Sequence, residues 1–246
     1  MTRPAGFYID VSPNGRYFTD PQGAPWFFLG DTLWELFRMY SRDDVEAILD
    51  TRIAQGFNAF LVMLNGVPEG GNGGLPGDRP WEGGTPPGLD ESYFAHVDSI
   101  VDLCSTRDAV FIVGVYHKSE DKLFTPSSAR AYARAVADRY KHVSNIVWCM
   151  YPEASSEYTD ACREIAAGLK EGAGHPLITI HPDPAPASSS FFGDEPWLAF
   201  NMLQVCVDYD RIHRMIRADY DLPPARPAVM AEGGYEGIEF GKTQDS

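Results

Sequence analysis

Two glutamates follow short apolar runs in this sequence, and their positions suggest acid–base chemistry. Glu153 comes after the run Asn145–Tyr151 and a proline, and Glu232 directly follows Pro227–Ala231. Apolar runs of this length are typical of strands buried on both faces of a parallel sheet. Cleavage of a glycosidic bond commonly uses two carboxyl groups, one that donates a proton and one that is ionised. We therefore predict that Glu153 is a general acid/base and Glu232 a nucleophile or base.

Two alternatives to this pairing follow from the same residues. Each glutamate could instead be a solvated residue at the start of a loop, although the nearby aromatic residues Trp148 and Tyr235 favour a sugar-binding site. Glu236 lies one short loop beyond Glu232 and could take its role. Glu232 is preferred because a residue that directly follows a strand is held more rigidly.

Other polar and aromatic residues recur where the predicted strands end, and these are expected to bind substrate. They are Asp31, Trp34, Asn65, His117, Trp148, His181, Gln204, Tyr235 and Glu236. The alternative for Asp31 is a capping role in the following turn, and a lone histidine is often purely structural. The sequence contains no HxH or HExxH spacing, no G-x-S-x-G segment and no P-loop, so we expect no metal, no cofactor and no serine nucleophile.

The elements that must position these residues alternate between apolar strands and amphipathic helices. A β-hairpin is predicted over residues 6–19, followed by seven strands and five main helices. The predicted strands are Trp26–Leu29, Phe57–Leu64, Val110–Tyr116, Asn145–Glu153, Leu177–Ile180, Leu198–Leu203 and Pro227–Ala231. The predicted helices are Asp43–Gln55, Glu91–Arg107, one that begins at Pro126, Ser156–Lys170 and Tyr209–Tyr220.

This alternation predicts a single α/β domain over residues 1–246 with a parallel sheet and helices outside it. A (β/α)8-type TIM barrel is favoured over a doubly wound sheet, because no GxGxxG follows the first strand and polar residues gather at the strand ends, where barrels place their sites. The last fourteen residues, 233–246, contain no eighth βα unit. The barrel is therefore expected to be open, or the chain to be a fragment, or a partner such as a second copy to complete it.

Composition excludes several classes of partner. With 20 basic and 35 acidic residues, the formal charge is −15, and this acidic balance argues against nucleic acid and anionic membranes. No apolar run is long enough to span a bilayer, and the N-terminal residues show no signal-peptide pattern, which favours a cytoplasmic location. The four scattered cysteines are expected to be buried free thiols.

Several segments resemble the apiosidase-like family of glycoside hydrolases. Asp20–Trp34 is similar to the family's DPxGxPFFxLGDTxW segment, with Trp26 in place of its usual phenylalanine, and Arg52–Asn58 is similar to RxxQGFN. Later matching segments follow in order: Asn145–Trp148, Thr179–Pro182, Phe200–Gln204 and Glu232–Gly237. The resemblance implies a (β/α)8 catalytic domain with an acid after strand four and a nucleophile or base after strand seven.

Two departures from the family pattern bear on function. Tyr151-Pro152-Glu153 stands where the family more often has Gly-Gly-Asp, and the final βα unit is missing. Hydrolysis of a glycoside or oligosaccharide is the leading hypothesis, with furanosides such as apiose or arabinose as candidate sugars. The alternative is a non-catalytic carbohydrate-binding or scaffolding barrel.

Overall fold

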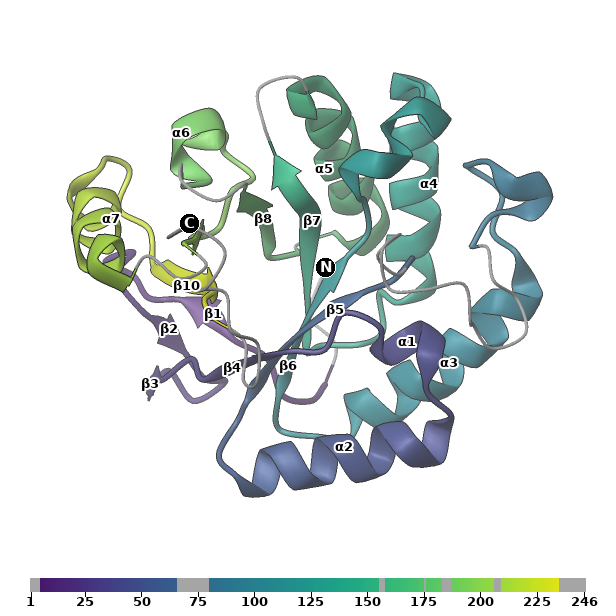
Figure 1. Ribbon diagram of the computed structural model, residues 1–246, viewed down its shortest axis with the longest axis horizontal. Coiled ribbons are helices and arrows are strands. Elements are labelled where there is room, and N and C mark those ends of the chain that lie inside the picture. The colour runs from purple at the N-terminus through teal and green to yellow at the C-terminus, as the bar shows by residue number, and fades with distance from the viewer. Residues whose placement is uncertain are drawn as a thin grey trace, which may run out of the picture.

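The computed structural model describes residues 5–65, 80–154, 158–174, 176–182, 187–205 and 209–234, without the side chains of 119–121, 151–154 and 209. Within this part of the chain, seven parallel strands follow one another in sequence order (Figure 1). Five form one sheet in the order β4 (Gly30–Thr32), β5 (Ala59–Met63), β6 (Val110–Gly114), β7 (Ile146–Ala154) and β8 (Ile178–Pro182). The other two, β9 (Asn201–Gln204) and β10 (Ala228–Glu232), pair with each other. A parallel bridge between Ile178 and Leu198 lies between the two sets, so the chain forms a parallel half-barrel that continues into β9 and β10.

Helices cover the outside of this sheet, as Figure 1 shows. The main helices are α2 (Arg42–Ala54), α3 (Glu91–Ser105), α4 (Pro126–Arg139), α5 (Thr159–Ala173) and α7 (Tyr209–Asp221). Shorter ones are α1 (Leu36–Met39), α6 (Ser189–Phe192), η1 (Glu82–Gly84) and η2 (Lys118–Leu123). The five predicted helices are thus confirmed, with ends that differ by a few residues. The starts of α2, α3 and α4 are capped by Ser41, Asp90 and Thr125. Thr125, for example, precedes Pro126 and accepts from the backbone N–H of Ser128.

The N-terminal hairpin is part of a three-stranded antiparallel sheet. Its strands are β1 (Asp10–Val11), β2 (Phe18–Thr19) and β3 (Pro25–Trp26), in that order. The prediction that Trp26–Leu29 forms the first barrel strand is wrong, because Trp26 belongs to β3 and barrel pairing begins only near Leu29. The side chain of Asn58 fixes the connection, donating to the Phe27 carbonyl at 2.7 Å and accepting from the Leu29 N–H at 2.9 Å. Phe27, which the apolar run suggested was buried, is 77% exposed.

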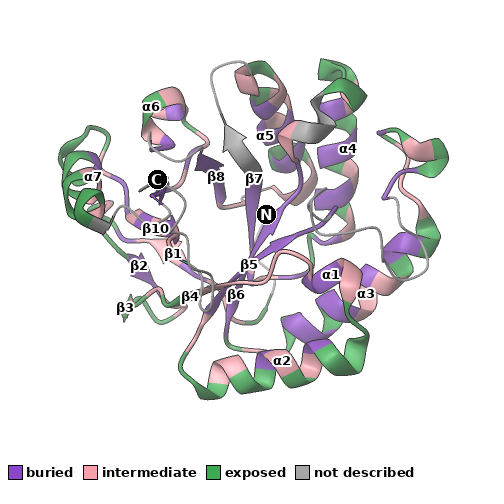
Figure 2. Cartoon of the chain, viewed as in Figure 1, coloured by how far each residue is buried: buried purple, intermediate pink, exposed green. Residues whose placement is uncertain are grey.

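The strands β5, β6, β8 and β9 are buried on both faces, whereas β4 and β10 are partly exposed (Figure 2). Alternate residues of β5, β6 and β7 enter two different apolar clusters. One cluster lies inside the curved sheet and contains Leu61, Ile112, Cys149, Met202 and Val229, among others. The other lies between the sheet and the helices and is larger. The inner cluster is closed from below by the N-terminal sheet, since Phe18 packs edge-on against Phe200 with ring centroids 5.0 Å apart.

The sheet does not close on itself within the described residues. An opening of about 520 Å³ lies between β4 and β10, the first and last parallel strands. Aromatic and aliphatic side chains line it, including Phe18, Trp26, Phe28, Leu61 and Val229. The space between these two strands is where a further strand would have to lie for the sheet to become a closed barrel.

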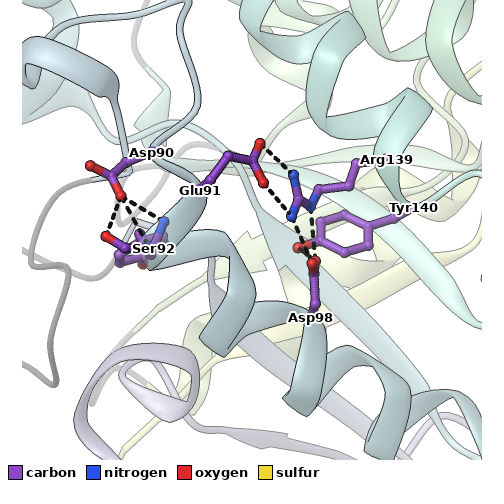
Figure 3. Close-up of polar contacts among 7 residues, drawn as sticks. Asp90, Glu91, Ser92, Asp98, Arg139 and Tyr140 are labelled. Atoms are coloured by element: carbon purple, nitrogen blue, oxygen red, sulfur yellow. Dashed lines mark hydrogen bonds and ion pairs between the residues drawn. The ribbon is translucent and has the colours of Figure 1, made fainter.

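An ion-pair network joins α3 to α4 (Figure 3). Arg139 donates to Asp98 Oδ2 at 2.7 Å and to Glu91 Oε1 at 3.0 Å, and the Tyr140 hydroxyl donates to Asp98 Oδ1 at 2.9 Å. Burial alone would raise the pKa of Asp98, but the hydrogen bonds from Arg139 and Tyr140 outweigh it and hold that pKa below its ordinary value. The network therefore stabilises the ionised form of Asp98 in the folded protein.

This network predicts a pH-dependent contribution to stability. Because the folded-state pKa of Asp98 is depressed, its contribution is complete above the ordinary carboxyl pKa and is lost as the pH falls through the folded-state value. Asp98→Asn is expected to lower the free energy of unfolding at pH 7 by about 1 kcal/mol, since the pair is partly solvated. Urea unfolding of both proteins from pH 7 down to pH 3 should show the difference shrinking. Asp102→Asn, at an exposed position of the same helix, is the control, and a pH-independent difference would contradict the argument.

Candidate functional site

Glu232 lies at the carboxyl end of β10, beside the last residue of β9. The two strands are in register so that Glu232 pairs with Gln204, after a shift at Met230. The Gln204 side-chain amide donates to Glu232 Oε2 at 2.7 Å, and Gln204 itself is buried. A hydrogen bond from a neutral donor to a carboxylate oxygen favours the ionised carboxyl group and fixes its direction.

His181, near the end of β8, approaches the same oxygen. Its Nε2 lies 3.5 Å from Glu232 Oε2, and its Nδ1 lies 3.1 Å from the carbonyl oxygen of Pro182. The imidazole is fully buried, and burial lowers its pKa to about 3 despite the hydrogen bond with Pro182. Trp34 packs edge-on against it, with ring centroids 5.7 Å apart. We call Trp34, His181, Gln204 and Glu232 the Glu232 cluster.

The Glu232 cluster brings together four of the residues that the sequence predicted for the site. They come from the segment after β4 and from β8, β9 and β10. Carboxyl ends of parallel strands share one edge of the sheet, and this shared edge explains why residues so far apart in sequence meet. The Glu232 side chain is 10% exposed, so the carboxyl group is largely shielded from bulk water. Such a carboxyl group can exchange a proton or attack a bound molecule at the rim of the sheet.

Two other predicted residues are bonded to the surrounding scaffold. Asp31 forms an ion pair with Arg52 of α2, with 2.6 Å between Oδ2 and Nε. Asn65 accepts from the Tyr132 hydroxyl at 2.9 Å and donates to the Val115 carbonyl at 3.3 Å. These contacts give both side chains a structural role between the sheet and the helices, outside the Glu232 cluster.

Trp148 lies apart from the Glu232 cluster, on the side of the sheet that faces the helices. Trp148 is buried in the outer apolar cluster between sheet and helices, whereas its neighbour Cys149 faces the inside of the sheet. His117 follows β6 and is partly buried, and burial together with the charge of Lys118 lowers its pKa to about 4. It is therefore a neutral imidazole at neutral pH.

The side chains of three predicted site residues lie outside the part of the chain that the structure describes. Glu153 lies within β7, but its side chain is outside the described part of the structure, and Tyr235 and Glu236 lie beyond its last described residue. The sequence analysis predicted no role for Pro182, whose carbonyl oxygen lies 3.1 Å from His181 Nδ1. Its position directly after the histidine, at the end of an apolar run, could have indicated this contact.

Three of the four cysteines lie within the described residues. Cys104, Cys149 and Cys162 are buried free thiols, as predicted, and Cys206 is outside the described residues. Burial raises the pKa of Cys149 to about 12, so it is a neutral thiol.

Within the described ranges, no group of three or more His, Cys, Asp or Glu side chains is arranged to hold a metal ion. None of the described helices combines the length and apolar character that crossing a membrane requires.

Comparison with solved structures identifies the class of protein that this fold defines. A glycoside hydrolase family 5 protein from Bacteroides vulgatus ATCC 8482 superposes with a TM-score of 0.78 and 25% sequence identity, over 95% of this chain and 56% of that one. A second glycoside hydrolase gives a TM-score of 0.80 at 24% identity, over 95% and 58%. The catalytic domain of an endoglucanase from Thermobifida fusca shares the fold at 13% identity, with a TM-score of 0.62 over 92% and 73%. The fold is thus that of barrel-type glycoside hydrolases.

The sequence itself places the chain more narrowly. The family model "Apiosidase-like, catalytic domain" matches residues 12–246, so the chain belongs to the apiosidase-like family, as its sequence segments predicted. Comparison with curated proteins gives no match. The chain spans just over half the length of the first two solved structures that it resembles.

Proposed function

We propose that this chain is a glycosidase that hydrolyses an O-glycosidic bond with two carboxyl groups, Glu232 and Glu153. The observation that carries the proposal is the carboxyl group of Glu232, held at the rim of the parallel sheet by Gln204 and placed beside His181. Family membership and the fold of glycoside hydrolases support it. In this assignment Glu232 is nucleophile or base and Glu153, at the end of β7, is the general acid/base.

The substrate proposed is a glycoside or oligosaccharide, with a furanoside such as apiose or arabinose as the first candidate. Trp34 supports a sugar ligand, because the flat face of an aromatic side chain can stack on a sugar ring and this one is only partly buried. The domain proposed is a single (β/α)8-type barrel over residues 1–246, with seven parallel strands in the part of the chain that the structure describes. The opening between β4 and β10 supports this assignment.

The experiment that tests the function is a hydrolysis screen of the purified chain. The substrates are p-nitrophenyl furanosides and pyranosides, including the apioside and the arabinofuranoside, and the readout is released nitrophenol. We expect turnover on at least one, with less on the others. Sugar binding by calorimetry without any turnover, unchanged in Glu153→Ala and Glu232→Ala, would instead favour a non-catalytic carbohydrate-binding barrel.

For an active substrate, the anomeric form of the first product distinguishes two mechanisms. Retention requires carboxyl groups about 5–5.5 Å apart, and inversion about 6.5–9.5 Å. Proton NMR of the product during the first minutes of hydrolysis reports the stereochemistry directly.

A further inference from the structure

The ring of His181 is held by two different contacts, one at each nitrogen. Nδ1 lies 3.1 Å from the Pro182 carbonyl oxygen, and Nε2 lies 3.5 Å from Glu232 Oε2. A carbonyl oxygen can only accept a hydrogen bond, so the contact with Pro182 requires a hydrogen on Nδ1. This places the proton of the neutral ring on Nδ1 and leaves a lone pair on Nε2, which lies 3.5 Å from Glu232 Oε2.

A lone pair and an ionised carboxylate oxygen repel each other at this distance. Two arrangements remove the repulsion. Either Glu232 carries a proton that points to Nε2, or Nε2 carries it and the ring becomes an imidazolium paired with a carboxylate. Both have the same number of protons, and they differ only in the position of one proton between Oε2 and Nε2.

We propose that His181 is the proton partner of Glu232, with Nδ1–H fixed by Pro182 and a single mobile proton shared between Nε2 and Glu232 Oε2. His181 is then a positioning residue for the Glu232 carboxyl group, and the role of sugar binding predicted from the sequence is replaced. The inference about the proton stands on the geometry alone; only its catalytic consequence rests on the proposed function.

Two opposing influences act on the shared proton. The Gln204 amide donates to Oε2 and favours the carboxylate, which moves the proton to Nε2. Complete burial of the imidazole disfavours the imidazolium and moves the proton back to Oε2. The titration therefore belongs to the pair and to neither residue alone.

Three neutral side chains lie beside this pair. Cys149 on β7 interacts with the backbone of His181, and its thiol stays neutral because burial raises its pKa to about 12. Trp34, packed against the ring from the segment after β4, carries no charge. Gln204 on β9 does not titrate. Cys149, Trp34 and Gln204 therefore add no charge beside the His181–Glu232 pair.

Catalysis uses this arrangement in a simple way. Transfer of the proton from Oε2 to Nε2 breaks one O–H bond, forms one N–H bond and converts the carboxylic acid into a carboxylate. The carboxyl group becomes a nucleophile or base without a water molecule entering the buried side of the site. The imidazolium that results has its Nδ1–H on the Pro182 carbonyl oxygen and its Nε2–H 3.5 Å from the Glu232 carboxylate.

Nitrogen NMR of the full chain, labelled with ¹⁵N-histidine, tests the proton positions directly. We expect Nδ1 of His181 to be protonated from pH 4 to 9, and the Nε2 resonance to follow one titration. That titration should be absent in Glu232→Gln, which cannot ionise. The proposal would be overturned if Nδ1 carried no proton. It would also be overturned if the Nε2 resonance were constant with pH, or the same in both proteins. This readout needs no substrate, so it fails independently of the glycosidase assignment.

A pair of variants tests the role in catalysis. His181→Asn keeps a donor near the position of Nδ1 and removes Nε2, whereas His181→Gln places an amide near Nε2; neither titrates. In both variants, we expect a shift in the pH dependence of kcat/KM. The apparent pKa that belongs to the His181–Glu232 pair should move by about one pH unit or more, while the circular dichroism spectrum stays unchanged. A raised KM with an unmoved profile and unchanged kcat would identify His181 as a substrate-binding residue and would overturn the proposal.

Discussion

Replacing Glu232 with glutamine is expected to lower kcat by roughly 100- to 10,000-fold, the usual effect of losing a group that transfers protons or attacks the substrate. Glutamine has nearly the same shape and keeps an oxygen that can accept from Gln204. It cannot ionise, however, and it cannot share a mobile proton with His181. The measurement is kcat on the best glycoside from the hydrolysis screen.

The same substitution should leave the fold intact, and this separates chemistry from stability. Glu232 is one-tenth exposed and lies at the end of β10, so an uncharged isostere removes no packing. Thermal unfolding is expected to shift by less than about 4 °C, which corresponds to about 1 kcal/mol for a chain of this size. Glu164→Gln makes the same charge change on α5, where Glu164 pairs with Arg130 of α4, and it should keep full activity. Full activity in Glu232→Gln would remove Glu232 from the mechanism.

Much of the fold was predictable because the strands are short apolar runs and the helices have one apolar face. The order of the barrel strands and the positions of the main helices follow from these patterns. The start of the first barrel strand was not predictable, because the run Trp26–Leu29 is as apolar as a buried strand although Phe27 is exposed. What decides the boundary is the side chain of Asn58, about thirty residues away, which binds the backbone at Phe27 and Leu29. A local pattern contains no information about such a contact.

The site was predictable at the level of strand ends, but not at the level of side-chain direction. Glu232, Gln204 and His181 meet as expected for residues at one edge of a parallel sheet. Asn65 follows β5 at the same edge but bonds toward the helices, and Trp148 lies inside β7 and also faces the helices. Because these strands are buried on both faces, hydrophobicity does not alternate along them, and the sequence gives no sign of which residues face inward.

Gly168→Ala is expected to destabilise the protein by about 2–3 kcal/mol through the contact between α4 and α5. A Cβ at position 168 would lie 2.3 Å from the carbonyl oxygen of Arg130 and 2.9 Å from the Cβ of Ala133. The first of these is backbone and cannot rotate away, so the helices must separate or bend, at a cost typical of overpacked interiors. Differential scanning calorimetry should show a melting temperature lower by about 4–12 °C.

The sign of this change distinguishes packing from local helix preference. Alanine is a better helix former than glycine by about 1 kcal/mol, so propensity alone predicts that Gly168→Ala stabilises α5. Gly172 repeats the arrangement one turn later, where a Cβ would lie 2.5 Å from the Arg134 carbonyl oxygen; two glycines at this spacing let α4 and α5 approach closely. Lys170→Ala, at an exposed position of the same helix, should be nearly neutral. A higher melting temperature for Gly168→Ala would show that α5 can shift without loss, and that the close approach of the two helices does not contribute to stability.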